Sequence, residues 1–522
     1  MRQVFQGTFF CRRLARLLGL LSLVSELLRK KFLHLTEDFW IFAPHAVEMD
    51  HSYRGQRRGL IELGTVTVRG SCNECRVIVD PYAAEAIARY VPDTLQIELT
   101  GWARSYYTLE QYVNAILAYD VPKLPEPTDV RWLQTKQHTE AIFRGLPKVR
   151  SISYKDFDTV KWIRSSSAGY GYIGHKGDEG NYTKAKRTAV TIAEKLDHDH
   201  AYGPEAIENS TPDVAFTRTQ LSQLKVKSKV RNVWGEAFHY VLLEGLFADP
   251  LIEMFKEAES FYFIGTNPAC SVPVLIEEIL SDHDYVYMFD WSGFDSTVQE
   301  WELRFAFDCL SKILMFPSNV EAQIWQFLIE LFIYRKIAGP NQVLYLKAQG
   351  IPSSSCFTNL IGSITNFVRI QYMFKRLTDC FACVFTHGDD SFAGVGAAQY
   401  VPMDRFEEVC NPLNWKLNIL KSRVSRRRGD SAFFLSRTVK ERQNTRDELA
   451  CLRMLTYPEY EVQQGSISAL RAKSIYIDAG LDSQYLYDIF DYLKLRYGIA
   501  TSLPLELRVW DPIEYEARRM SA

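Results

Sequence analysis

Two short sequences place aspartates where apolar, strand-like runs end. One is Gly388-Asp389-Asp390, a turn between two apolar runs, and the other is Asp290, which follows residues 285–289. A buried hairpin gains nothing from two adjacent anions, because removing unpaired charge from water is costly. Hard divalent cations bind oxygen ligands and remove that cost. If the two strands lie side by side, Asp290 and Asp389 can hold two cations between them, an arrangement used for in-line phosphoryl transfer.

Each aspartate taken alone also has an ordinary explanation. An isolated Gly-Asp-Asp is more often a solvated turn than a metal site. Asp295 stands five residues after Asp290, at the start of residues 298–313, whose apolar residues repeat every three or four positions. It can therefore cap the helix that this spacing predicts. Asp290 has no comparable structural role, so the remaining motifs must decide between the explanations.

Two further segments carry polar groups that suit nucleic acids or nucleotides. Residues 225–231 alternate cations with small or apolar residues, so a strand there would direct four cations to one face: Lys225, Lys227, Lys229 and Arg231. That face is either a lysine-guarded edge strand or a cationic wall for a triphosphate. Residues 160–185 combine glycine, serine, aromatic residues and Lys176, which suits a single-stranded RNA path and an ordinary surface loop equally.

Several of these sequences together resemble a known family. Asp290-x4-Asp295, then residues 350–359 and then Gly388-Asp389-Asp390 resemble, in order and separation, motifs A, B and C of viral RNA-dependent RNA polymerases. The resemblance covers roughly residues 160–440, and several motifs in order are far more specific than any one of them. Within that class, residues 290–295, 167–170 and 233–235 resemble the double-stranded RNA viruses of the partitivirus and picobirnavirus group. Residues 169–178 resemble the picobirnavirus side of that group more closely.

The resemblance implies an α+β fold of the right-hand polymerase type, with fingers, palm and thumb, an antiparallel palm sheet and an N-terminal extension. The domain boundaries that it implies are, in chain order, an N-terminal extension bridging fingers and thumb at residues 1–130, fingers at 131–240, palm with motif A at 241–310, a fingers insertion at 311–348, palm with motifs B to E at 349–438, and thumb at 439–522.

The resemblance also implies roles for individual residues. The expected ligands of two Mg2+ or Mn2+ ions are Asp290, Asp389 and Asp390, and Lys421 joins them in the catalytic set as the general acid for the leaving pyrophosphate. The residues expected to bind the nucleotide are Lys227, Lys229, Arg231, Asp295, Ser353, Thr358, Asn359 and Asn366. The residues expected to contact template or product RNA are Ser167, Gly169, Tyr170, Lys176, Phe434 and Arg437.

The sequence departs from the family pattern at two positions of motif B. Ser354 stands where the family usually has glycine, which reduces the freedom of the loop. Gly362 stands where the family usually has Asp or Asn, so it cannot orient Asp295 toward a ribose hydroxyl. Asn359 and Asn366 are both candidates for that partner of Asp295.

Composition limits the alternatives further. The chain has 522 residues, 47% of them hydrophobic, which is enough for a large core and a few domains. A net charge of −2 excludes a uniformly basic RNA coat, so any RNA-binding charge must be concentrated in a channel. Ten scattered cysteines indicate a reducing compartment, and a zinc site shared by Cys72/Cys75 and Cys380/Cys383 is disfavoured by the strand placement of the second pair.

Residues 1–32 are basic and apolar and predict a helix whose leucine face packs on the protein itself. A mitochondrial presequence or a membrane-surface helix has a similar pattern, whereas Arg16 and Glu26 disfavour a transmembrane span.

The resulting hypothesis is an RNA-directed RNA polymerase of a double-stranded RNA virus, which replicates and transcribes the genome by a two-metal mechanism. The expected partners are template and product RNA, ribonucleoside triphosphates and viral capsid protein, with no membrane, and the expected location is the virion interior and the host cytoplasm. Two alternatives remain. A reverse transcriptase shares the palm but carries an aromatic residue at the sugar-sensing position, where this chain has Asp295. A catalytically inactive RNA-binding protein of the capsid interior would be expected to have lost one of the three aspartates.

Overall fold

The computed structural model describes residues 58–68, 74–199, 204–217, 220–225, 230, 232–266, 268–426, 431–440 and 443–501. The predicted helix at residues 1–32, Cys72 and the three cations Lys227, Lys229 and Arg231 lie outside the described residues.

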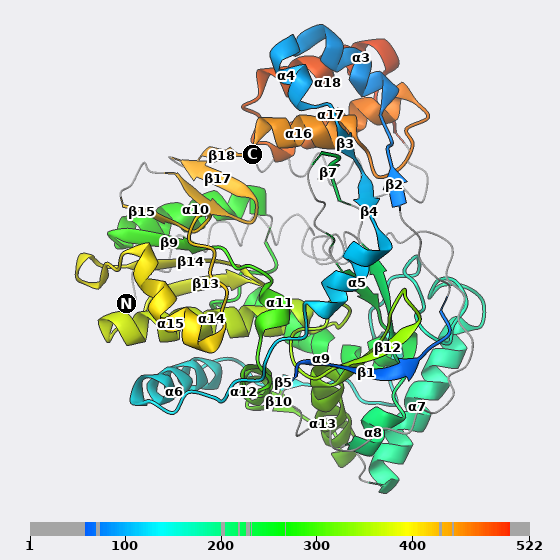
Figure 1. The fold of residues 1–522 in the computed structure, drawn as a ribbon, viewed down its shortest axis with the longest axis vertical. Helices are drawn as coiled ribbons and strands as arrows, with labels where there is room; N and C mark the ends of the chain where they lie inside the picture. The colour runs from blue at the N-terminus through cyan, green and yellow to red at the C-terminus, as the bar shows by residue number, and fades with distance from the viewer. Residues whose placement is uncertain are drawn as a thin grey trace.

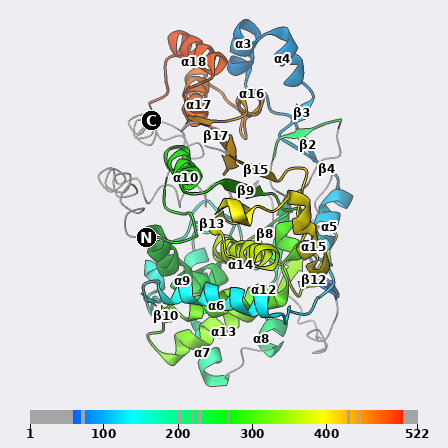
Figure 2. The ribbon, with the colours of Figure 1, turned by 90° about the vertical axis from the view of Figure 1, so that its left-hand side faces the viewer.

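A four-stranded antiparallel sheet carries the aspartates. Its strands run in the order β13 (Cys383–His387), β14 (Asp390–Val395), β9 (Tyr285–Phe289) and β15 (Arg423–Ser425). Side chains alternate along β9, so Val286 and Met288 face a core formed with α10 (Pro268–Asp282), and Tyr287 and Phe289 face the core formed with α14 (Thr358–Thr378). Figure 2 shows α10 and α14 on opposite sides of this sheet.

A five-stranded sheet forms a second layer. Its order is β1 (Leu60–Thr65), β12 (Val343–Lys347), β11 (Arg335–Ala338), β6 (Asp213–Thr217) and β8 (Asn232–Gly235). Strands β11 and β6 are parallel, and the other neighbours are antiparallel. The helices nearby are α7 (Asn181–Asp199), α8 (Pro204–Glu208), α9 (Phe238–Glu257), α12 (Glu300–Ser311) and α13 (Asn319–Ile333).

The chain that follows β1 reaches the far end of the molecule, where it forms two helices. Figures 1 and 2 show α3 (Pro81–Tyr90) and α4 (Asp93–Glu98) beside the C-terminal bundle, which we define as α16 (Glu448–Thr456), α17 (Gly465–Asp478) and α18 (Gln484–Tyr497). Apolar residues of α3 and of all three bundle helices form one core. Since β1 pairs with β12, this part of the chain contacts the five-stranded sheet through β1 and the C-terminal bundle through α3.

The remaining elements are short connections and small sheets. The other helices are α5 (Leu109–Leu117), α6 (Val130–Arg144), the one-turn α11 (Phe294–Thr297) and α15 (Glu407–Cys410). The other strands are β2 (Glu74–Arg76), β3 (Trp102–Ala103), β4 (Ser105–Tyr107), β5 (Val149–Arg150), β7 (Ser222–Gln223), β10 (Leu314–Met315), β16 (Ala432–Phe434), β17 (Arg437–Lys440) and β18 (Gln443–Thr445). Among the described helices, none has the length and apolar character required to cross a membrane.

A buried ion pair fastens α3 to the bundle. Asp80 is fully buried, caps α3 by accepting from the amides of Tyr82 (3.1 Å) and Ala83 (3.0 Å), and accepts from the Ser468 hydroxyl at 2.7 Å. It also pairs with Arg471, a buried residue of α17. One carboxylate therefore satisfies groups from both ends of the chain.

We predict that Asp80→Ala lowers the free energy of unfolding by about 3–5 kcal/mol, because it leaves the Arg471 guanidinium buried without its partner. Urea denaturation measures the change. Asp93→Ala, which removes an exposed carboxylate at the start of α4, is the matched control and should stay within about 0.5 kcal/mol of the wild type. Equal stability of the two variants would contradict the structural role of Asp80.

Candidate active site

The strand register brings the predicted aspartates together. Ser391 of β14 pairs with Phe289 of β9, so Asp390 and Asp290 occupy the next positions along the same two strands. Asp389 lies in the two-residue turn that joins β13 to β14. Gly388 in that turn has φ +62°, and a Cβ there would lie 3.3 Å from the amide nitrogen of Asn359. Glycine is therefore required in this turn. The three aspartates lie together at one end of the two central strands, which we call the sheet edge.

Helix α14 holds this turn from one side. The side-chain amide of Asn366 donates to the carbonyls of Gly388 (3.0 Å) and Asp389 (2.9 Å), and its oxygen accepts from Trp291 Nε1 at 2.9 Å. One turn earlier, the Ser363 hydroxyl accepts from the Gly388 amide at 2.7 Å. Asn366 thus connects the residue after Asp290 with the turn that contains Asp389.

A second clamp from the same helix holds the segment after Asp290. The buried Arg369 guanidinium donates to Glu302 at 2.7 and 2.9 Å and to the hydroxyl and carbonyl of Thr297 at 3.2 Å each. It also lies 5.6 Å from the ring centre of Trp291 and 4.9 Å from that of Phe294. Residues 291–302 are therefore fixed to α14 by charge, hydrogen bonds and cation–π contacts together.

The segment that contains Lys421 lies on the other side of Asp290. The Asp290 amide donates to the Ser422 hydroxyl at 3.0 Å, and the Asn418 amide donates to the Asp290 carbonyl at 2.8 Å. Lys421 itself is exposed, and its backbone amide donates to the Asn418 carbonyl at 3.2 Å. The structure thus places Lys421 one residue from a direct contact with Asp290, with a side chain that extends into solvent.

The predicted sugar-sensing residues surround the start of α14. Asp295 is half-buried on α11, and its carbonyl accepts from the Ile351 amide at 2.9 Å. Burial, and secondly the charge of Asp295, raise the pKa of Tyr119 well above its usual value. The Asn359 oxygen accepts from the Tyr262 hydroxyl at 2.7 Å. The Asn366 amide is bound to Trp291, Gly388 and Asp389, and which of the two asparagines partners Asp295 stays a prediction.

The predicted nucleotide-binding hydroxyls of motif B make contacts within the protein. Ser353 Oγ accepts from the Trp234 amide at 2.9 Å, and Thr358 Oγ1 donates to the Pro352 carbonyl at 2.5 Å. Gly362 faces the Gly388 turn, where an added Cβ would lie 3.5 Å from the Gly388 Cα. Helix α14 therefore approaches the turn closely at the position where the family usually has Asp or Asn.

The residues predicted to contact template mostly hold their own loop together. Lys176 is buried, donates to Ser166 Oγ (2.8 Å) and the Ser167 carbonyl (2.9 Å), and has its pKa lowered to about 8 by burial. Gly169 has φ +81°, and a Cβ there would lie 2.3 Å from the Glu236 carbonyl. Tyr170 is buried in a small apolar cluster. Contact of this loop with RNA stays a prediction.

The two residues predicted to support product RNA also face inward. Phe434 is 1% exposed and packs against Phe392 and Phe263. Arg437 donates to the Asp478 carbonyl at 2.8 Å and to its carboxylate, which joins β17 to α17 of the C-terminal bundle. Both side chains therefore have partners within the protein, and their contact with RNA stays a prediction.

The donor chemistry at the sheet edge fits a hard divalent cation. Asp389 is exposed and Asp290 is half-buried, and no lysine or arginine among the described residues pairs with either carboxylate. Carboxylate oxygens are the ligands that Mg2+ prefers. No three His, Cys, Asp or Glu side chains of the described residues already enclose one common metal position. The edge therefore offers suitable oxygen donors on two neighbouring strands, without a preformed cage.

Sequence reasoning missed two of the residues that hold this site. Arg369 and Arg335 were not singled out, although each is a fully buried arginine within an otherwise largely apolar run. A buried arginine requires anionic partners, so a charged residue inside such a run is the signal that could have identified both. Their partners lie far away in the sequence and could not be read from it.

Comparisons with known proteins agree with this geometry. The family described as viral RNA-dependent RNA polymerase matches residues 78–494. Among curated proteins, the genome polyprotein of human hepatitis A virus genotype IB (isolate MBB) is 26% identical over 193 residues, 34% of this chain and 8% of that protein. The RNA-directed RNA polymerase of Cryptosporidium parvum virus 1 (strain KSU-1) is 30% identical over 135 residues, 24% of this chain and 25% of that protein. The match thus spans a quarter or less of the length of these curated relatives.

Solved structures show the same fold. The RNA-dependent RNA polymerase of a human picobirnavirus superposes with a TM-score of 0.59 at 14% identity, covering 81% of this chain and 86% of that one. Its insertion-loop deletion mutant gives a TM-score of 0.61 at 15% identity, covering 81% and 87%. The predicted right-hand α+β fold is confirmed, and so is the predicted family resemblance. Because the family match extends over most of the sequence, the chain belongs to the viral RNA-dependent RNA polymerases.

Proposed function

We propose that this chain is an RNA-directed RNA polymerase that copies a single-stranded RNA template into RNA, in the replication and transcription of a double-stranded RNA virus. The observation that carries the proposal is the position of Asp290, Asp389 and Asp390 at one edge of the β9–β14 pair, with α14 holding both segments. The family match supports the reaction type, and the relative from Cryptosporidium parvum virus 1 supports the virus class.

The chemistry assigns a distinct part to each group. When bound at the three aspartates, two Mg2+ or Mn2+ ions lower the pKa of the RNA 3′-hydroxyl and neutralise charge on the triphosphate. Asp290 and Asp389 orient the reacting groups because their backbones are fixed by Ser422 and Asn366. Lys421 gives a proton to the leaving pyrophosphate. Reaction by positioning and charge neutralisation requires few other reactive side chains.

The substrates and surroundings follow from the same proposal. Ribonucleoside triphosphates, RNA template and RNA product are the molecules bound, with the cations of residues 227–231 assigned to the triphosphate. We further propose that the protein works inside the virion and in the host cytoplasm, in contact with capsid protein. Incorporation of labelled nucleotides on a single-stranded RNA template, with ribo- and deoxyribonucleotides and with or without Mg2+ or Mn2+, tests the activity directly and separates it from reverse transcription.

Asp290→Ala and Asp389→Ala should each abolish RNA synthesis while RNA binding stays nearly unchanged. Each change removes carboxylate oxygens from the cation site, whereas RNA affinity comes from cationic and stacking contacts elsewhere. Nucleotide incorporation and an RNA gel shift measure the two properties. Asp404→Ala, which removes an exposed aspartate that is not among the predicted site residues, is the control and should retain activity. Full synthesis by either site variant would remove the proposed role of the aspartates.

Lys421→Leu should slow turnover by about 10²–10⁴-fold with little change in nucleotide affinity, because a general acid acts in the chemical step. Single-turnover incorporation over a range of nucleotide concentrations separates the rate from the affinity. Lys155→Leu removes an exposed lysine that has no predicted role in the site and serves as the control. If Lys421→Leu changed only nucleotide affinity, Lys421 would be a binding residue and Lys416 the alternative acid.

Asp295→Ala should relax discrimination against deoxynucleotides by roughly tenfold or more, since a ribonucleotide offers a 2′-hydroxyl donor to the Asp295 carboxylate and a deoxynucleotide does not. Asn359→Ala should have the same effect, because Asn359 is the candidate partner that the Gly388 turn does not occupy. Asn366→Ala should instead reduce incorporation of both sugars, because it releases the turn. The ratio of ribo- to deoxyribonucleotide incorporation efficiency decides. An unchanged ratio for Asp295→Ala would leave Asp295 as a structural residue of α11.

A further inference from the structure

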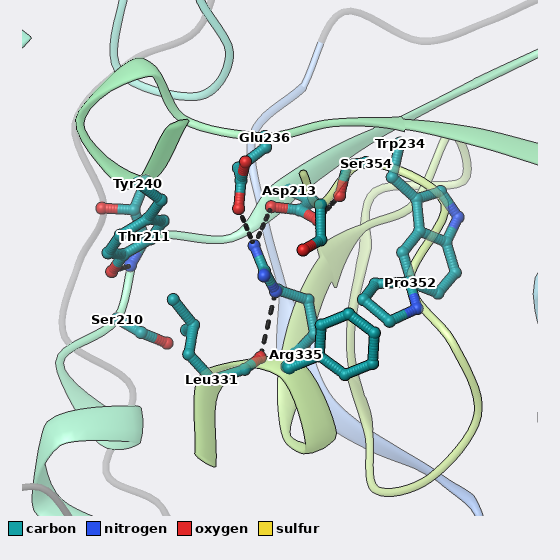
Figure 3. A network of polar contacts seen from close by, with 12 residues as sticks. Ser210, Thr211, Asp213, Trp234, Glu236, Tyr240, Leu331, Arg335, Pro352 and Ser354 are labelled. Atoms are coloured by element: carbon teal, nitrogen blue, oxygen red, sulfur yellow. Dashed lines mark hydrogen bonds and ion pairs between the residues drawn. The ribbon is translucent and has the colours of Figure 1, made fainter. Parts of the chain in front are cut away.

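A buried ionic network lies behind the start of α14. Arg335 of β11 is fully buried, and its guanidinium donates to Asp213 of β6 at 3.2 Å, to Glu236 at 2.7 Å and to Glu244 of α9 at 3.1 Å. Its Nε donates to the Leu331 carbonyl at 3.0 Å. Figure 3 shows the guanidinium between Asp213, Glu236 and Leu331. Three carboxylates from separate segments thus converge on one cation.

The outer oxygens of two of these carboxylates face the motif B loop, which we define as residues 353–356. Asp213 Oδ2 accepts from the Ser354 hydroxyl at 2.6 Å, and this contact is drawn in Figure 3. Glu244 Oε2 accepts from the Ser355 hydroxyl at 2.8 Å and from the Cys356 amide at 2.7 Å. Three consecutive residues of the loop are therefore held by carboxylates that Arg335 itself holds.

The third carboxylate, Glu236, belongs to the segment after β8, which packs against residues 168 and 169. The Glu236 carbonyl lies against Gly169, and the Phe238 amide donates to the Ala168 carbonyl at 3.0 Å. Burial, and secondly the charge of Glu244, raise the pKa of Glu236 well above its usual value. Glu236 contacts Arg335 but not the motif B loop, so Asp213 and Glu244 are the carboxylates that accept from the loop.

Ser354 is the informative residue because the family usually has glycine there. A glycine has no hydroxyl for Asp213 and gives the loop more conformational freedom. A hydrogen bond to a charged, buried acceptor is stronger than a neutral one, so the Ser354–Asp213 bond restrains the loop where a glycine would leave it free. The loop also carries Ser353 and leads into Thr358 and Asn359, which the proposed function assigns to the nucleotide.

We propose that Ser354, Asp213 and Arg335 form a lock that fixes the motif B loop in one conformation, with Asp213 and Arg335 as positioning residues for the nucleotide. The inference rests on the proposed function for its effect on the reaction, but the lock itself is a property of the folded chain. It predicts that loss of the Ser354–Asp213 hydrogen bond alone changes nucleotide use more than stability.

The test compares Ser354→Ala, which removes the hydroxyl, with Ser354→Thr, which keeps it. The control is Ser281→Ala, which removes a hydroxyl that donates to the Glu277 carbonyl of the same helix at 2.7 Å, far from the loop. Ser354→Ala should raise the KM for nucleotides by roughly tenfold, the usual effect of losing one hydrogen bond to a charged group, with a melting temperature close to that of the control. Ser354→Thr should stay within about threefold of the wild type on the same ground.

Asp213→Asn keeps the shape of the side chain and weakens its acceptor. The double variant Asp213→Asn/Ser354→Ala should be no worse in KM than the poorer single variant, because both changes break the same bond. Additive effects would overturn the lock. A wild-type KM for Ser354→Ala, in an assay in which the wild type polymerises, would also overturn it.

Hydrogen exchange on the full chain separates failure of the lock from failure of the proposed function. Peptides covering residues 351–357 should exchange at least about tenfold faster in Ser354→Ala than in the wild type or in Ser281→Ala, whether or not the chain polymerises. Unchanged exchange in these peptides would overturn the lock. Faster exchange in a chain without polymerase activity would support the lock and would remove the proposed function instead.

Discussion

The fit of helix α14 against the Gly388–Asp389 turn is the contact on which the candidate active site depends. Ser363, Asn366 and Arg369 follow one another at intervals of three residues along one stripe of the helix. Each binds a different part of the site: the turn amide, the turn carbonyls together with Trp291, and the segment that ends at Glu302. One stripe of a single helix thus contacts both strand ends that carry the aspartates, while direct pairing of β9 with β14 sets their separation.

Neutralisation of buried charge is the second physical constraint. Arg335 and Arg369 are both fully buried and both bind carboxylates, yet they have different surroundings. Arg369 has one carboxylate partner and several aromatic rings, so its charge is balanced locally. Arg335 has three carboxylate partners, and burial together with the neighbouring carboxylate charge raises the pKa of Glu236 well above its usual value. The Arg335 network holds the motif B loop before α14, and the Arg369 network holds the segment that follows Asp290.

The family resemblance carried by the ordered motifs was sufficient for the fold class, and short-range patterns were sufficient for bringing together the aspartates. Apolar runs that end in Asp290 and in Gly388-Asp389-Asp390 predict paired strands, and the register of β9 and β14 agrees with that prediction. Side-chain direction was harder to predict. Phe434 and Lys176 have the residue types of RNA contacts, but both are buried. Their direction was not predicted, because composition does not encode which face of a short loop or strand packs on its neighbours. Asn366 was recognised as important, but its partners are backbone carbonyls, which no residue type reveals.

The strap formed by residues 60–90 has a mechanical consequence. The C-terminal bundle is joined to the rest of the molecule covalently through β18 and α16, and also through α3, whose chain leads back to β1 in the five-stranded sheet. Several connections in parallel, the Arg437–Asp478 and Arg104–Glu459 ion pairs among them, resist rotation about any one of them. A hinge opening that pulled the bundle away from α3 would expose the apolar surface that they share, whereas a small sliding movement would keep it covered. The shared core therefore opposes opening of the bundle more than it opposes shear.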